Sequence, residues 1–214
     1  EVKRGVIAVP TAGGAVAVVY NLPGINNVRL SADAMKDIFE GKITRWNDAK
    51  ITAISGQVKN LPNTPIRVVV RADSSGTTFI FANHLQAIGS SVKAAAQPSW
   101  PGSPVSGQGN PGVAALVKNT AGAIGYVQDT YARQNSLQTA FIQNKAGRFV
   151  DPSLAEAEKA LAGETFPADF RLVEGNPSDG YPIVGLTWLL IYKEYPAAKA
   201  EAIKKMVNWV MTTG

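Results

Sequence analysis

The stretch IRVVVRADSSGTTFIFANH, residues 66–84, decides both the fold and the candidate site of this chain. The β-branched run from Ile66 to Val70 predicts a short strand that is buried on both faces. Residues 72–76 are small and polar, which is typical of a tight turn. Apolar residues along one side of the next segment predict a helix over residues 77–88. A strand, a short turn and a helix in this order are typical of an α/β fold.

The start of this predicted helix is a candidate anion site. The first N–H groups of a helix have no intrahelical partner, and the helix dipole places about half a positive charge there. Arg71, at the strand end, adds a fork of donors that suits phosphate or carboxylate. Two structural interpretations compete with this one: Arg71 and Asp73 form an ion pair at the strand end, and residues 74–77 serve only to cap the helix. The residues by themselves leave these alternatives open.

Length and composition limit the class of protein. A chain of 214 residues suffices for one large domain or two small ones, and 45% hydrophobic with 17% charged residues is ordinary for a folded protein. It has no apolar run of the ~20 residues that span a bilayer, and no cysteine for disulfides or thiol chemistry. The net charge of +5 favours anionic partners, but the basic residues are scattered, so no nucleic-acid partner is predicted.

Alternating strand and helix patterns along the chain also predict an α/β architecture. Ser31 is expected to cap a helix that ends at Gly41, and residues 6–20 are expected to form two strand pieces joined at Gly13 and Gly14. Asn110 and Pro111 are expected to cap and start a further helix. The preceding residues, 90–109, are expected to form a long loop. The other predicted elements are strands at 122–127 and 181–192, a hairpin over 141–150, and helices at 49–54, 131–136, 152–161 and 196–211.

The patterns that would indicate an enzyme or a metal site are weak. His84 is the only histidine and lies in the middle of a predicted helix, where a packing role is favoured over a catalytic one. No G-x-S-x-G elbow accompanies it, so no Ser-His-Asp hydrolase is predicted, and one histidine without cysteine argues against zinc. The glycine-rich residues 107–110 lack the Lys-Ser/Thr ending of a P-loop and are interpreted as structural. We therefore expect a binding protein with no metal and no cofactor.

Several segments, in order, resemble the phosphate-binding proteins of bacterial ABC transporters. A single Ser-Gly-Thr would be a weak signal, but an ordered set spread over the chain is a specific one. The segment Arg71–Phe79 resembles the family's phosphate loop. The other matching segments are residues 13–16, 21–24, 37–48, 100–101, 107–110, 122–127 and 181–183.

This resemblance implies a type II periplasmic-binding-protein fold, in which two α/β lobes close on a dehydrated phosphate. It makes Arg71 the charged donor, gives Ser75 and Thr77 hydroxyl and backbone donors, and gives Gly76 a backbone N–H at close approach. It also implies that Asp73 pairs with Arg71 and fixes its fork. The expected partners are inorganic phosphate and a membrane permease, and the expected location is the periplasm or the cell surface.

The resemblance also implies that the chain is a partial member of this family. Residues 1–12 are expected to be a crossover from the first lobe, residues 13–181 the second lobe with the phosphate loop, and residues 182–214 a strand and helix that return to the first lobe. The chain begins at Glu1, without methionine or signal peptide, so a processed or truncated product is expected. The carboxylate that accepts the phosphate proton is expected in the absent N-terminal part. The alternative is a structural or interaction subunit whose missing lobe a second chain supplies.

Overall fold

The computed structural model of this chain describes residues 5–54, 56–168, 172–173 and 175–213. The chain divides into two compact units, which are described one at a time. Unit 1 comprises Glu1–Gly13, Thr165–Val173 and Leu186–Gly214, and unit 2 comprises Gly14–Glu164 and Glu174–Gly185.

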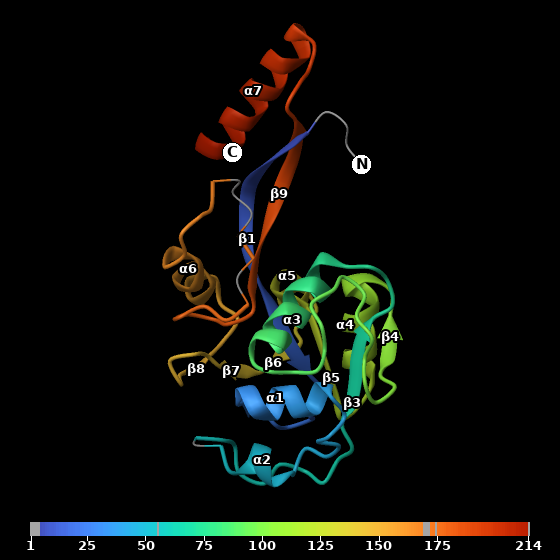
Figure 1. Cartoon of the computed structure of the whole chain (residues 1–214). Helices are drawn as coiled ribbons and strands as arrows, with labels where there is room; N and C mark the ends of the chain where they lie inside the picture. Colours follow the sequence, from blue (N-terminus) through green and yellow to red (C-terminus); the bar gives the residue numbers. More distant parts are fainter. Residues whose placement is uncertain (1–4, 55, 169–171, 174, 214) are drawn as a thin grey trace. The chain divides into compact units, whose positions relative to one another are not determined.

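Strands and helices alternate along the chain, as labelled in Figure 1. The strands are β1 (Val6–Tyr20), β2 (Arg29–Leu30), β3 (Arg67–Arg71), β4 (Val105–Gly107), β5 (Ala123–Gln128), β6 (Gln138–Thr139), β7 (Phe141–Gln143), β8 (Phe149–Val150) and β9 (Val184–Tyr192). The helices are α1 (Ala32–Phe39), α2 (Ala49–Thr52), α3 (Gly76–Ala87), α4 (Gly109–Asn119), α5 (Asp129–Gln134), α6 (Leu154–Ala162) and α7 (Ala197–Thr212).

The main sheet has the strand order β4-β3-β5-β1-β6, and β9 also pairs with β1. β3 is parallel to both of its neighbours, with Val69 opposite Val105 on β4 and opposite Gly125 on β5. β1 runs antiparallel to β5 and β6. A smaller sheet joins β2, β7 and β8. The parallel part, β4-β3-β5, therefore brings the carboxyl ends of its strands to one edge.

Unit 2 buries apolar side chains on both faces of the main sheet. Val18 and Val19, successive residues of β1, belong to different hydrophobic clusters because neighbouring strand residues point to opposite faces. Val70 and Val69 divide in the same way, which confirms the expected burial on both faces for this half of the strand. The first cluster includes residues of α1 and α3, and the second includes residues of α4 and α5. Helices on both faces of a partly parallel sheet confirm the predicted α/β class.

Most local predictions hold to within three residues. Ser31 caps α1, with its hydroxyl accepting the N–H of Ala34 at 3.1 Å, and Gly41 follows the helix at φ +74°. β7 and β8 form the predicted antiparallel hairpin, with Ile142 opposite Val150. These elements were predictable because capping residues and turn glycines act within a few residues.

The expectation of two strand pieces over residues 6–20 is wrong, because β1 is a single strand. Glycine adopts extended backbone without steric cost, and pairing with β9 supplies the ladder that keeps the strand continuous. The boundary between the two units nevertheless falls between Gly13 and Gly14.

The predicted start of the fourth helix is also wrong. α4 begins at Gly109 after Gln108, and Asn110 is inside the helix, where its side chain accepts the N–H of Gln128 at 3.3 Å. Pro111 fits because the N–H groups of the first helical turn need no intrahelical acceptor. Part of the expected loop is the three-residue strand β4, which is too short to show a pattern of alternation.

Unit 1 contains the first part of β1, most of β9 and all of α7. Thr11 and Thr187 join the two strands, with the Thr11 hydroxyl donating to the Thr187 carbonyl at 3.3 Å. Among the described residues of α7, none is buried. No helix in the described part of the chain combines the length and the apolar character that crossing a membrane requires.

Candidate functional site

The segment predicted to bind an anion lies at the carboxyl edge of the parallel strands. We call residues 71–77 the anion loop. β3 ends at Arg71, directly opposite Gly107 at the end of β4, and each strand leads into a helix, α3 or α4. In open α/β sheets the crevice outside the carboxyl ends of the strands is the usual ligand position. The N-termini of α3 and α4 therefore lie beside this edge.

The structure brings Arg71 and Asp73 together as a bidentate pair. Nε and Nη2 of Arg71 donate to Oδ1 and Oδ2 of Asp73 at 2.8 and 2.5 Å. The Arg71 side chain is only 9% exposed, and its Nη1 has no hydrogen-bond partner among the described residues. Asp73 Oδ1 also accepts the backbone N–H of Gly109, at the start of α4, at 3.0 Å. The hydrogen bonds from Arg71, and then that from Gly109, hold the pKa of Asp73 far below its ordinary value, so this carboxylate stays charged.

The first turn of α3 presents free donors. Ser75 is the N-cap, since its hydroxyl oxygen accepts the N–H of Thr78 at 3.3 Å, while its own N–H donates to Ala96 O at 2.9 Å. Within the described part of the chain, neither N–H of Gly76 and Thr77 has an acceptor, and the Thr77 hydroxyl has no partner. Gly76 is exposed, and no atom lies within 4 Å of the position a Cβ would take. Two N–H groups and two hydroxyl hydrogens are thus available to an anion.

The backbone of the anion loop is held by its neighbours. The N–H of Ala72 donates to Gly107 O at 2.9 Å, and Gln97 Nε2 donates to Ala72 O at 3.2 Å. With the bond from Ser75 to Ala96, these contacts fix the turn without using the donors that face outward. The loop is therefore pre-organised, which lowers the entropy lost on binding.

Sequence reasoning missed two groups that contact the anion loop. One is the Gly109 N–H, because the sequence favours a structural role for residues 107–110, with lining of the cleft as the alternative, and indicates no contact with Asp73. The other is Tyr126 on β5, whose hydroxyl oxygen accepts the Arg71 N–H at 3.3 Å and lies 2.8 Å from Thr78 Oγ1. The glycine-rich segment 107–110 is a sequence signal that could have pointed to the Gly109 contact. Gly109 takes φ +66°, a backbone conformation that favours glycine. No local pattern points to Tyr126.

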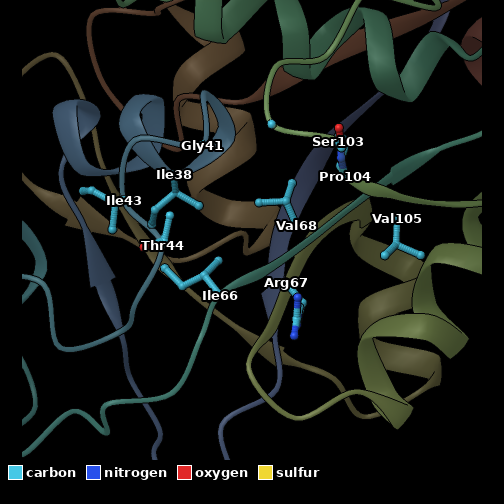
Figure 2. A pocket seen from close by; sticks show the side chains of 11 residues that line it. Ile38, Gly41, Ile43, Thr44, Ile66, Arg67, Val68, Ser103, Pro104 and Val105 are labelled. Atoms are coloured by element: carbon cyan, nitrogen blue, oxygen red, sulfur yellow. The ribbon is translucent and has the colours of Figure 1, made fainter.

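A separate cavity of about 160 Å³ lies at the other end of β3 (Figure 2). Its wall includes Ile38, Arg67, Val68 and Val105, so it is beside the amino ends of β3 and β4. Figure 2 shows the side chains of Ile38 and Val68 extending toward one another. No residue of the anion loop lines this cavity. The cavity is therefore separate from the anion loop.

His84 is buried in α3, as expected for a packing residue. Its Nδ1 lies 2.6 Å from the carbonyl oxygen of Gly175, and the side chain is 1% exposed. Burial lowers the pKa of His84 to about 4, against the opposing effect of the Gly175 hydrogen bond, so the ring is neutral at neutral pH. Among the described residues, no cluster of three or more His, Cys, Asp or Glu side chains could hold a metal ion.

Comparison with known proteins places the chain in a family. A family model described as a PBP superfamily domain matches residues 1–213. The phosphate-binding protein PstS of Methanocaldococcus jannaschii is 38% identical over 96% of this chain and 59% of its own length. The PstS protein of Xylella fastidiosa strain Temecula1 is also 38% identical, over 99% of this chain and 61% of its own length. The chain thus spans about three fifths of the length of these curated relatives.

Solved structures show the same fold. A high-affinity periplasmic phosphate-binding protein bound with phosphate has a TM-score of 0.75 and 24% identity, over 96% of this chain and 63% of that protein. The phosphate-binding protein from Stenotrophomonas maltophilia has a TM-score of 0.68 and 23% identity, over 96% of this chain and 60% of that protein. With the family match over residues 1–213, these similarities show that the chain belongs to the PBP superfamily domain family, as a PstS-like member with an α/β fold.

Proposed function

We propose that this chain binds inorganic phosphate reversibly, as the solute-binding component of an ABC-type uptake system that delivers it to a membrane permease. The observation that carries the proposal is the free donor set at the start of α3, next to the fixed guanidinium of Arg71. The names of the relatives, phosphate-binding proteins in both comparisons, support the same ligand. The solved relative described as a periplasmic protein supports a periplasmic or cell-surface location.

The chemistry of the anion loop suits binding more than catalysis. Gly76 and Thr77 offer N–H groups, Ser75 and Thr77 offer hydroxyls, and Arg71 offers its remaining guanidinium hydrogens. All of these are donors, so the loop stabilises a tetrahedral oxyanion through several hydrogen bonds at once. The only carboxylate in the loop, Asp73, already accepts from Arg71 and Gly109 and serves to fix the fork. A nucleophile paired with a base is not part of the proposed site.

We also propose an assignment of the chain to the two lobes of a periplasmic-binding protein. Residues 13–181 form the second lobe and carry the anion loop, whereas residues 1–12 and 182–214 belong to the first. The acceptor that distinguishes a protonated phosphate from sulfate belongs to the part of the relatives that this chain does not span. Supply of that part by a second chain is the alternative arrangement, and no contact described above favours it.

The test is calorimetric titration of the 214-residue chain with phosphate. Arg71→Met removes the charged donor and is expected to lower the affinity at least about a hundredfold, and Thr77→Val to lower it about tenfold. Arg67→Met is the matched control, because Arg67 begins the same strand that Arg71 ends, and should leave the affinity unchanged. Tight binding that survives Arg71→Met would remove this loop from the site. A wild-type chain that binds no phosphate would refute binding by this chain alone.

A further inference from the structure

The hydroxyl of Tyr126 joins the strand end to the helix start on either side of the anion loop. Its oxygen accepts the backbone N–H of Arg71 at 3.3 Å and lies 2.8 Å from Thr78 Oγ1, where either oxygen can donate. Arg71 is the last residue of β3, and Thr78 is in the first turn of α3. A third element, β5, therefore bridges the two ends of the loop through one oxygen atom.

The ring that carries this hydroxyl is held firmly. Tyr126 is completely buried and stacks on Phe81 of α3, with ring centroids 4.3 Å apart and an interplanar angle of 13°. Phe39 and Trp100 lie further around it, with centroids at 6.4 and 6.0 Å. Because the ring cannot move freely, the hydroxyl is a fixed point from which the positions of Arg71 and Thr78 are set.

The bridge determines where the ligand donors lie. Thr78 N–H is held by the Ser75 cap, so fixing the Thr78 hydroxyl also fixes the turn that carries the N–H groups of Gly76 and Thr77. Arg71 N–H is fixed at the same oxygen, which sets the root of the guanidinium relative to that turn. We propose that Tyr126 is a positioning residue of the anion site, which holds Arg71 in register with the start of α3 without touching the ligand. This inference rests on the proposed binding of phosphate at this loop.

Tyr126→Phe tests the proposal, because it removes only the hydroxyl and keeps the stacked ring. It is expected to weaken phosphate binding about fivefold to tenfold in calorimetric titration. Tyr181→Phe is the matched control: Tyr181 is also completely buried, and its hydroxyl donates to Val16 O at 3.0 Å and accepts the Val18 N–H at 3.4 Å. Both variants are expected to lose thermal stability, but only Tyr126→Phe is expected to lose affinity. Equal affinity losses in the two variants, or none in Tyr126→Phe, would overturn the proposal.

Substitutions of Thr78 provide a second test of the proposal. Thr78→Val removes the other end of the bridge and should reproduce the loss, whereas Thr78→Ser keeps a hydroxyl and should retain the affinity. The double variant of Tyr126→Phe and Thr78→Val should lose no more affinity than Tyr126→Phe alone, because Tyr126→Phe already removes both contacts of the bridge. Fully additive losses would show that the two hydroxyls act separately and would contradict the bridge.

A third readout separates this inference from the proposed function. The amide resonances of Gly76 and Thr77 in the ligand-free chain should shift in Tyr126→Phe and stay in place in Tyr181→Phe. If the wild-type chain bound no phosphate, the proposed function would fail, while these resonances would still report whether Tyr126 positions the loop. Unchanged resonances in Tyr126→Phe would overturn the positioning role whatever the ligand.

Discussion

His84 links the stability of the fold to pH at the scale of one residue. Its pKa is about 4 in the folded chain and about 6.5 when the ring is free in water. Between these values the unfolded chain binds more protons than the folded one, so the free energy of unfolding should fall as the pH falls from 6.5 to 4. The contribution of this one group is about 3 kcal/mol over that window, and it is constant below pH 4.

Chemical denaturation at several pH values measures this effect. His84→Gln keeps an amide that can donate to the Gly175 carbonyl but cannot titrate, so the variant should lose most of the slope between pH 6.5 and 4. Carboxylates elsewhere titrate equally in both proteins, so their contributions cancel when the two free energies of unfolding are subtracted. A variant with the wild-type slope would show that His84 is not the group responsible.

At the scale of the element, the start of α4 should matter as much to the site as the start of α3. Gly109 takes φ +66°, which directs its N–H to Asp73, and a Cβ there would lie 3.2 Å from Pro111 Cδ. Gly109→Ala should cost about 1–2 kcal/mol of stability and also weaken phosphate binding, because the Asp73 carboxylate loses its second anchor.

Gly147 is the matched control for this substitution. It takes φ +82° in the turn between β7 and β8, and no atom lies within 4 Å of the position of a Cβ. Gly147→Ala should therefore carry a similar backbone cost, measured by thermal unfolding, with no change in phosphate affinity. A loss of affinity in both variants would mean that Gly109 acts only through stability.

The same elements show what the sequence could predict. Strand β3 and helix α3 follow from local patterns, because β-branched runs and helix caps are effective over a few residues, and the i, i+2 spacing places Arg71 close to Asp73. The contacts of Gly109 with Asp73 and of Tyr126 with Arg71 join residues that are 36 and 55 positions apart. They depend on β4 and β5 lying on either side of β3, which no local pattern specifies.

At the scale of the whole molecule, unit 1 exposes several large apolar side chains. On α7, Met206, Trp209 and Met211 are 44, 59 and 54% exposed. Large exposed apolar side chains are typical of surface that packs against other protein. We expect the 214-residue chain to self-associate at high concentration, and Met206→Gln with Trp209→Gln to reduce this in sedimentation velocity experiments.

Leu154 on α6 gives the control, since it is 59% exposed but belongs to unit 2. Leu154→Gln should leave self-association unchanged. Because no described residue of α7 is buried, the α7 variant should keep the phosphate affinity and the melting temperature of unit 2. A wild-type chain that stays monomeric at every concentration would contradict this prediction.

The pairing of Arg71 with Asp73 determines how ionic strength should affect phosphate binding. The two opposite charges nearly cancel at a distance, so the loop presents oriented dipoles to an approaching anion more than it presents a net charge. Added salt screens charges that are separated by water far more than it weakens hydrogen bonds in contact with a ligand. The net charge of +5 is scattered over the chain and is the part that salt can screen. Salt should therefore slow the capture of phosphate more than it shortens the lifetime of the bound state.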